Sequence, residues 1–145
     1  MDQVIALMEK YLADKTTDSK LITPSMINNY VKLGIMPAPV KKKYSREHLA
    51  YLFIICSLKQ VMPISNIKSM IDEKLKKNSI EEILDFYSNL YDFSFNTLIE
   101  YIASSKASNI ETIEDASLFS AIAAVNCRNI SNKLFYLNSS KNEIK

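Results

Sequence analysis

Four polar residues of the sequence share a spacing that suits contact with nucleic acid. A serine, two asparagines and a lysine recur at i, i+3, i+4 and i+7, so they lie on one face of a predicted helix: Ser25, Asn28, Asn29 and Lys32. Asparagine amides carry a donor and an acceptor that can pair with adenine edges in the major groove. Serine can contact a base or a phosphate, and lysine can contact a phosphate. We expect this face to bind double-stranded DNA.

A run of cations follows this helix. Between Ser19 and Arg46 the chain has six Lys or Arg residues and no Asp or Glu. A basic patch of this kind is typical of a surface that binds a polyanion, although a solvated loop has the same composition. The expected phosphate contacts come from the N-terminus of the helix and from the cationic segment with its tyrosine: Thr23, Lys41, Lys42, Lys43, Tyr44 and Arg46. Tyr44 either fastens this segment or touches a phosphate itself.

Cap residues set the bounds of the element that carries the polar face. Thr23 is a good N-cap, Pro24 suits the first helical position, and Gly34 supplies the left-handed residue that ends a helix. The sequence therefore predicts a recognition helix over residues 24–33, with Tyr30 on its packed side. Residues 36–39 force an extended turn, and residues 40–44 are predicted to form a basic hairpin or wing.

Apolar periodicity predicts further helices on both sides of this segment. Residues 2–13 form a first amphipathic helix, and a helix over residues 46–61, capped by Ser45, is apolar almost all round and should be the central core helix. Ser65 is expected to cap a helix ending near residue 75, and Ser79 with Glu82 forms a capping box for the next one. Residues 92–96 are expected to break or kink that helix. A last helix is expected to begin after a cap at residues 112–115, and the tail from residue 138 should fray. Near the N-terminus, residues 14–20 are expected to form a polar connector after the first helix.

Charge divides the chain into two regions. Residues 1–77 contain 13 Lys or Arg against 7 Asp or Glu, a net charge of +6, whereas residues 78–145 contain 5 against 9, a net charge of −4. We place a domain boundary at the charged hinge over residues 74–78. The predicted organisation is a DNA-binding module over residues 1–77 and a helical dimerisation or effector region over residues 78–145. The fold class is mainly α.

Composition narrows the function further. The longest apolar run, residues 49–56, is far shorter than the roughly 20 residues that cross a bilayer, and the N-terminus has no signal-peptide pattern, so we expect a cytoplasmic protein without membrane contact. Cys56 and Cys127 lie in apolar helical patterns and are expected to be buried, reduced thiols. A single glycine argues against a phosphate-cradling loop. His48, the only histidine, is expected on a helix surface. The residue spacing offers no set of nucleophile, base and orienting group, so we expect that the protein is not an enzyme and binds no metal or cofactor.

The motifs together resemble a known family. Residues 23–37, 43–49 and 62–71 are similar to the MerR family of bacterial transcription regulators, in which a recognition helix, a wing ending in Tyr-Ser and a further capped helix follow one another. The matching positions are Tyr30, Gly34, Ile35, Met36 and Pro37 in the first element, Tyr44, Ser45 and Leu49 in the second, and Ile64, Ser65 and Ile67 in the third. Among MerR-like proteins, the chain most resembles the uncharacterised bacterial proteins grouped as domain-of-unknown-function family 1836.

The resemblance implies a MerR-like winged helix-turn-helix in the N-terminal half, followed by a small helical C-terminal extension. It covers roughly residues 22–75. Asn28 and Asn29 replace the Arg-Tyr pair that MerR-type helices place on the phosphate backbone. The C-terminal part lacks the long coiled coil with a cysteine-lined loop, so the resemblance implies no metal or drug specificity.

Three functions follow as hypotheses. The first is a homodimeric, sequence-specific transcription regulator whose paired recognition helices read half-sites about 34 Å apart. The second is a protein-interaction adaptor on a winged scaffold, docking through the aromatic residues of the acidic half: Phe86, Tyr87, Tyr91, Phe93, Phe95 and Tyr101. Such aromatics are more often core residues than interface residues. The third is that this half encloses a pocket for an apolar effector. The predicted partners accordingly include an unknown small-molecule or protein effector.

Overall fold

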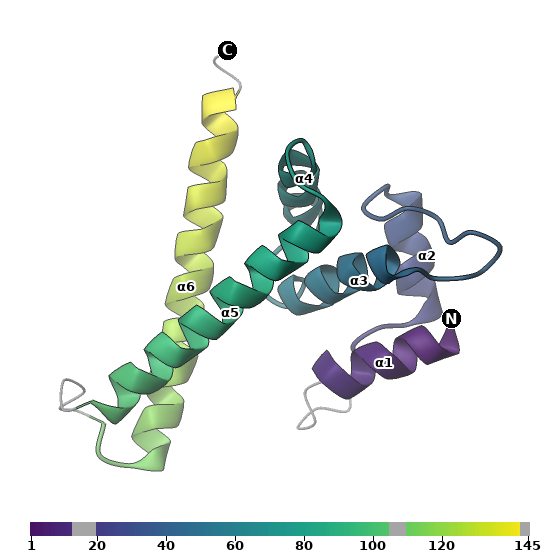
Figure 1. Cartoon of the computed structure of the whole chain (residues 1–145). Helices are drawn as coiled ribbons and strands as arrows, with labels where there is room; N and C mark the ends of the chain where they lie inside the picture. Colours follow the sequence, from purple (N-terminus) through teal and green to yellow (C-terminus); the bar gives the residue numbers. More distant parts are fainter. Residues whose placement is uncertain (13–19, 105–109, 143–145) are drawn as a thin grey trace. The chain divides into compact units, whose positions relative to one another are not determined.

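The computed structural model describes residues 1–12, 20–104 and 110–142, with side chains as far as residue 137 (Figure 1). The described residues are mainly helical, as predicted. The helices in chain order are α1 (Asp2–Leu12), α2 (Pro24–Lys32), α3 (Arg46–Leu58), α4 (Ile64–Leu75), α5 (Ile80–Ala103) and α6 (Ile113–Asn142). The connector predicted over residues 14–20 lies almost wholly outside the described residues, and so do the last residues of the tail. No helix of the described chain combines the length and the apolar character needed to cross a membrane.

Contacts divide the chain into two compact units, Met1–Tyr87 (unit 1) and Ser88–Lys145 (unit 2). The division falls inside α5, ten residues after the boundary expected at residue 77. The physical reason is that Ile80 and Ile83, in the first turn of α5, are buried in the core of unit 1. The charged stretch before α5 is therefore a turn within unit 1.

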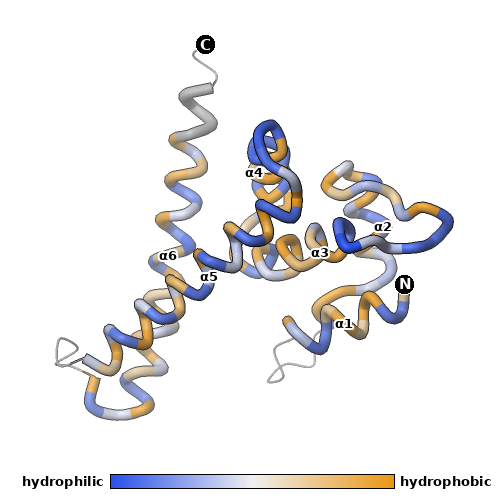
Figure 2. The backbone as a smooth tube through the Cα atoms, in the orientation of Figure 1, coloured by the Kyte–Doolittle hydropathy of each residue, from blue (hydrophilic) through white to orange (hydrophobic). Residues whose placement is uncertain are grey.

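The core of unit 1 is built on α3, as predicted. Leu52, Ile55 and Cys56 of this helix have no exposed surface, and α3 packs against α1 and α4. In Figure 2 the tube is hydrophobic along much of α3. From the other helices, α2 contributes Ile27 and Tyr30 to the same core. The exposed residues of α2 are thereby fixed on the side away from the core.

The C-terminus of α2 ends in a Schellman motif around Gly34. This residue has φ of +65°, its N–H donates to the carbonyl of Val31 at 3.0 Å, and the N–H of Ile35 donates to the carbonyl of Tyr30 at 3.0 Å. The paired 5→2 and 6→1 bonds satisfy carbonyls that a helix end leaves open. Ile35 and Tyr30 are both buried, which supplies the apolar contact that accompanies the motif. The helix end predicted at Gly34 is confirmed.

Two expectations about the later helices were wrong. The helix α5 runs without a break through residues 92–96, where the hydroxyls of Ser94 and Thr97 donate to the carbonyls of Tyr91 and Phe93. These bonds satisfy the hydroxyls within the helix, so the polar residues need not interrupt it. The helix α4 begins at Ile64 after Pro63, so Ser65 lies inside the helix and is not its cap. The capping box of Ser79 and Glu82 is confirmed, with Ser79 N–H donating to Glu82 Oε2 at 2.7 Å.

Candidate nucleic-acid interface

The polar face predicted on α2 is exposed. Ser25, Asn28, Asn29 and Lys32 are all exposed, whereas Ile27 and Tyr30 on the opposite side are 0% and 4% exposed. The Oγ1 atom of Thr23 accepts a hydrogen bond from the N–H of Met26 at 3.3 Å, which confirms the predicted N-cap. The helix thus presents an amide-rich surface on a rigid support.

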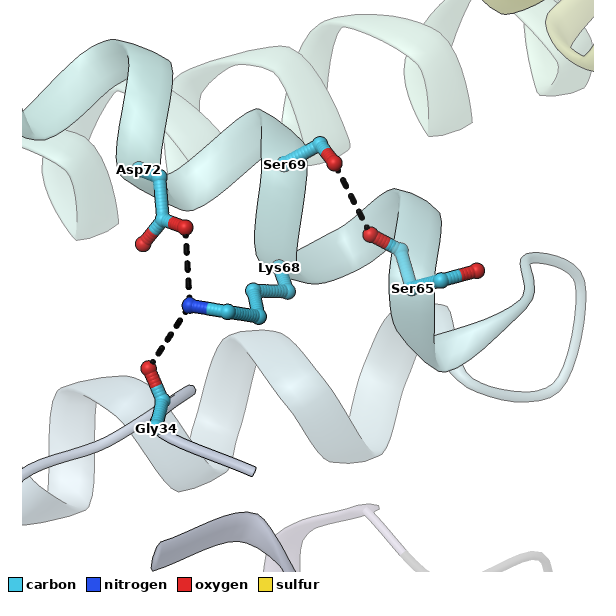
Figure 3. A network of polar contacts seen from close by, with 5 residues as sticks. All are labelled: Gly34, Ser65, Lys68, Ser69 and Asp72. Carbon is cyan, nitrogen blue, oxygen red and sulfur yellow. Dashed lines mark hydrogen bonds and ion pairs between the residues drawn. The ribbon is translucent and has the colours of Figure 1, made fainter. Parts of the chain in front are cut away.

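Three charged side chains from other parts of unit 1 fix both ends of α2. Before the helix, Glu9 of α1 accepts a hydrogen bond from the N–H of Ile22 at 3.3 Å, and Lys59, the C-cap residue of α3, donates to the carbonyl of Leu21. After it, the Lys68 ammonium of α4 donates to the carbonyl of Gly34 at 3.0 Å and pairs with Asp72 at 2.8 Å (Figure 3).

Sequence reasoning missed Glu9, Lys59 and Lys68 as positioning residues. Their partners are backbone groups 13, 38 and 34 residues away, and local periodicity carries no signal for such contacts. Because these three bonds go to backbone atoms, they constrain the path of the chain. Lys59 also contacts the Sδ atom of Met26 at 3.6 Å, but none of the three charged residues bonds to Ser25, Asn28, Asn29 or Lys32.

The predicted basic wing is a single tight turn. Val40 and Lys43 form an isolated antiparallel bridge, and the N–H of Lys43 donates to the carbonyl of Val40 at 2.9 Å. Among the described residues between α2 and α3, no extended strand forms around this bridge. In Figure 1 the segment leaves the end of α2 and projects outward before it returns to α3. Lys41 and Lys42 are the two residues between the bridged Val40 and Lys43.

Both central residues of this turn have left-handed backbone conformations. Lys41 has φ of +50° and Lys42 has φ of +62°. A hairpin turn with positive φ at both central positions normally uses Asn-Gly or a similar pair. Each side chain with a β-carbon in this region costs on the order of 1 kcal/mol. The turn therefore carries backbone strain at the two positions where its charges are most exposed.

The cations of this region have no carboxylate partner among the described residues. Lys32, Arg46 and the lysines of residues 41–43 are exposed, and none of them forms an ion pair with another described side chain. In contrast, Lys68 and Lys76 pair with Asp72 and Glu73 on α4. The positive charge around the turn is not neutralised within the described part of the chain.

The C-terminal end of the turn is attached to α3 through His48. The Nδ1 atom of His48 accepts a hydrogen bond from the N–H of Ser45 at 3.1 Å and lies 2.7 Å from Ser45 Oγ. The ring of Tyr44 meets the ring of His48 edge-on at 5.6 Å, and burial raises the pKa of the half-buried Tyr44. The expectation of a surface His48 was wrong, because its ring folds back on its own N-cap and is 5% exposed. The predicted cap at Ser45 is confirmed.

Other chemically reactive groups do not belong to this set of residues. Burial raises the pKa of the Cys56 thiol to about 11, which keeps it protonated and unreactive. Cys127 is exposed on α6, so the expectation that both thiols are buried holds only for Cys56. The described residues contain no cluster of metal-ligating side chains. An apolar groove of about 230 Å³ is lined by residues of α1, α3 and the start of α5, among them Leu7, Met8, Leu49, Phe53 and Leu84.

Comparison with known families places the chain in one of them. Residues 1–95 match the family described as "Domain of unknown function (DUF1836)", and the chain belongs to it. The matched region contains all of unit 1 and the first part of α5. No curated protein and no solved structure matches the chain, and the resemblance to the MerR family finds no support in these comparisons.

Proposed function

We propose that this protein binds double-stranded DNA as a sequence-specific transcription regulator. The recognition helix over residues 24–33 enters the major groove, and the basic turn over residues 40–44 contacts the sugar-phosphate backbone. The observation that carries the proposal is the pair of lysines, Lys41 and Lys42, held exposed in a left-handed turn and without carboxylate partners among the described residues. Asn-Gly would relieve the strain of this turn, so the choice of lysine favours a role for the charge itself.

The face of α2 supports the same function. Asn28 and Asn29 are exposed and rigidly supported, and their amides can read adenine, while Ser25 and Lys32 lie at the ends of the same face. Thr23 and the N-terminus of α2 add a phosphate contact. Phosphate contacts from Lys43, Arg46 and Tyr44 set the register of the helix on the duplex.

A binding role fits these residues better than catalysis. His48 is the only histidine of the chain, and its Nδ1 already accepts a hydrogen bond from its own N-cap. Its buried Nε2 has no hydrogen-bond partner among the described residues. We therefore assign the surface to recognition.

The experiment is a salt titration of duplex binding with two matched double variants. K41A/K42A removes two charges at the turn, and K76A/K77A removes two charges elsewhere in unit 1. We expect the first pair to reduce the slope of log K against log salt by about 2, since each phosphate contact contributes about 0.9. The control pair should keep the slope. Equal slopes for both pairs contradict the placement of the turn on DNA.

Exposed aromatic residues favour a second candidate function, the protein-interaction adaptor. Phe93 is 70% exposed, and Phe86, Phe95 and Tyr101 are each more than 40% exposed, although a core position was the commoner expectation for them. Exposed apolar clusters mark protein contacts. An adaptor predicts no duplex binding at low salt and a bound partner that is lost in Phe93→Ser. Duplex binding that survives this substitution supports the first function.

A further inference from the structure

Unit 2 has no interior of its own. Between Ser88 and Leu137 no described side chain is buried, whereas every buried residue of the core cluster lies before Leu84. The apolar residues of α5 and α6 are nevertheless numerous, as the hydropathy colours of Figure 2 show. A helix with this much apolar surface is normally buried. The described part of unit 2 therefore leaves this apolar surface uncovered.

The apolar surface of α5 is too wide for one neighbouring helix. Between residues 88 and 103 one side of the helix carries most of the polar residues, namely Ser88, Asn89, Asp92, Asn96 and Glu100. Apolar residues, with Ser94 and Thr97 among them, extend around more than half of the circumference. On one flank, the ring of Tyr101 stacks on Phe119 of α6 at 5.3 Å. On the other flank, Phe95 is 54% exposed. Within the hairpin, α6 therefore covers one flank of α5 only.

The helix α6 is also longer than its partner within unit 2. It has 30 residues, whereas α5 contributes residues 88–103, so the helical lengths are about 45 Å and 24 Å. Early residues of its apolar stripe, such as Phe119, are half-buried, but Ile130 and Leu134 on the same stripe are about 60% exposed. A second stripe, formed by Leu118, Ile122 and Val125, is more than 50% exposed throughout.

Three hydroxyls within these apolar surfaces are already hydrogen-bonded. The hydroxyls of Ser94, Thr97 and Ser120 donate to backbone carbonyls of their own helices at 2.8 to 2.9 Å. Hydroxyls bonded in this way can be covered without losing a hydrogen bond to water. These three hydroxyls therefore do not oppose burial in an apolar interface.

Charges on α6 favour a second copy of the chain as the occupant. Asp115 and Lys133 are 18 residues apart, which is five helical turns, so they lie on one side of α6, Asp115 in its first turn and Lys133 about two thirds of the way along it. An antiparallel second α6 places Lys133 of each copy beside Asp115 of the other. A two-fold interface of this kind is self-complementary, whereas a partner of one charge sign meets a repulsive residue at one end.

We propose that unit 2 is a homodimerisation hairpin, in which α5 and α6 of two chains pack antiparallel as a four-helix bundle. Two hairpins supply each helix with the second neighbour that its apolar surface requires. The proposal rests on unit 2 alone and does not depend on the assignment of DNA binding to unit 1.

The test is sedimentation equilibrium of the full chain with two α6 variants. Ile122→Glu places a charge on the exposed stripe, and Ala124→Glu places the same charge on the other side of the helix. We expect the wild-type chain and A124E to be dimers and I122E to be a monomer at the same concentration. A wild-type chain that stays monomeric, or an I122E variant that remains a dimer, overturns the proposal.

A pair of charge variants tests the antiparallel arrangement. K133E places two acids together at each end of the interface and should weaken dimerisation about tenfold. D115N/K133E removes the repulsion and keeps an oxygen for the cap of α6, so it should restore most of the affinity. Equal affinity for the two variants overturns the antiparallel arrangement.

The exposed Cys127 thiol gives a readout that does not depend on the variants folding identically. Its labelling by a maleimide should slow as the concentration of wild-type chain rises, and should be fast at every concentration in I122E. Protection of Cys127 at all concentrations in a monomeric chain would instead mean that unit 2 is covered by unit 1, and would overturn the proposal.

Discussion

The backbone of Lys41 and Lys42 links a residue-level property to function. Positive φ at two consecutive lysines could not be predicted from the sequence, since lysine has no preference for this region. The run of basic residues and a turn after Pro39 could both be predicted from the sequence. The sequence therefore indicated where the charge lies but not the conformation that exposes it.

Replacing both lysines by the residues that the turn prefers should separate stability from binding. We expect K41N/K42G to raise the free energy of unfolding by about 1 kcal/mol, because Asn and Gly adopt positive φ with little strain. The same variant should bind duplex DNA more weakly, because two phosphate contacts are lost. Urea denaturation and a binding titration measure the two effects.

The matched control is K76N/K77G, which removes two charges in unit 1 at positions whose φ is not positive. It should not gain stability and should keep its affinity for DNA. If K41N/K42G is no more stable than this control, the turn is not strained.

Tyr30 gives a pH dependence that can be measured directly. Burial raises its pKa to about 12, with a smaller contribution from Cys56, whereas an unfolded tyrosine titrates near 10. Its contribution to stability is complete below pH 10 and is lost as the pH rises toward 12, because only the unfolded chain ionises easily. We expect Tyr30→Phe to lose about 1 kcal/mol less stability than wild type between pH 9 and pH 11, measured by urea denaturation. Parallel pH profiles for the two proteins would contradict this assignment.

At the scale of elements, caps were the most predictable features and interruptions the least. Thr23, Gly34, Ser45 and the Ser79 capping box mark helix ends through local hydrogen bonds, which depend on a few neighbouring residues. The break expected at residues 92–96 does not occur, because the helix satisfies its own hydroxyls there. Contacts between distant elements, such as that of Lys68 with Gly34, leave no periodic trace in the sequence.

The Schellman motif should make Gly34 the residue most sensitive to a small substitution. A β-carbon at this position meets only Lys68 Nζ at 3.9 Å, so space is not the obstacle. The cost is conformational, and we expect Gly34→Ala to lose about 1 kcal/mol of unfolding free energy. Gly34→Asn should lose less, since asparagine tolerates the left-handed region. Equal losses in urea denaturation would point to another cause.

At the scale of the whole molecule, the boundary expected from charge and the division between the two compact units fall at different residues. Charge placed the boundary at residue 77, whereas burial of Ile80 and Ile83 extends unit 1 into α5. Burial depends on which element packs on which, and charge composition does not report it. The absence of buried residues in the described part of unit 2 could not be predicted either, because the apolar periodicity of its helices resembles that of a core helix.

Hydrogen exchange should reveal the difference in burial between the core of unit 1 and the helices of unit 2. Amides of α3 lie in the core of unit 1, so their protection should not change with protein concentration. Amides of α6 should be weakly protected in dilute solution and increasingly protected as the chain associates, because binding between copies stabilises the associated form by mass action. Exchange measured at two concentrations a hundredfold apart distinguishes the helices, with I122E as the control that should show no change in α6. Protection of α6 that is high and independent of concentration in the wild-type chain would mean that unit 2 is stable within one chain, and the dimer would not be needed to explain its apolar surface.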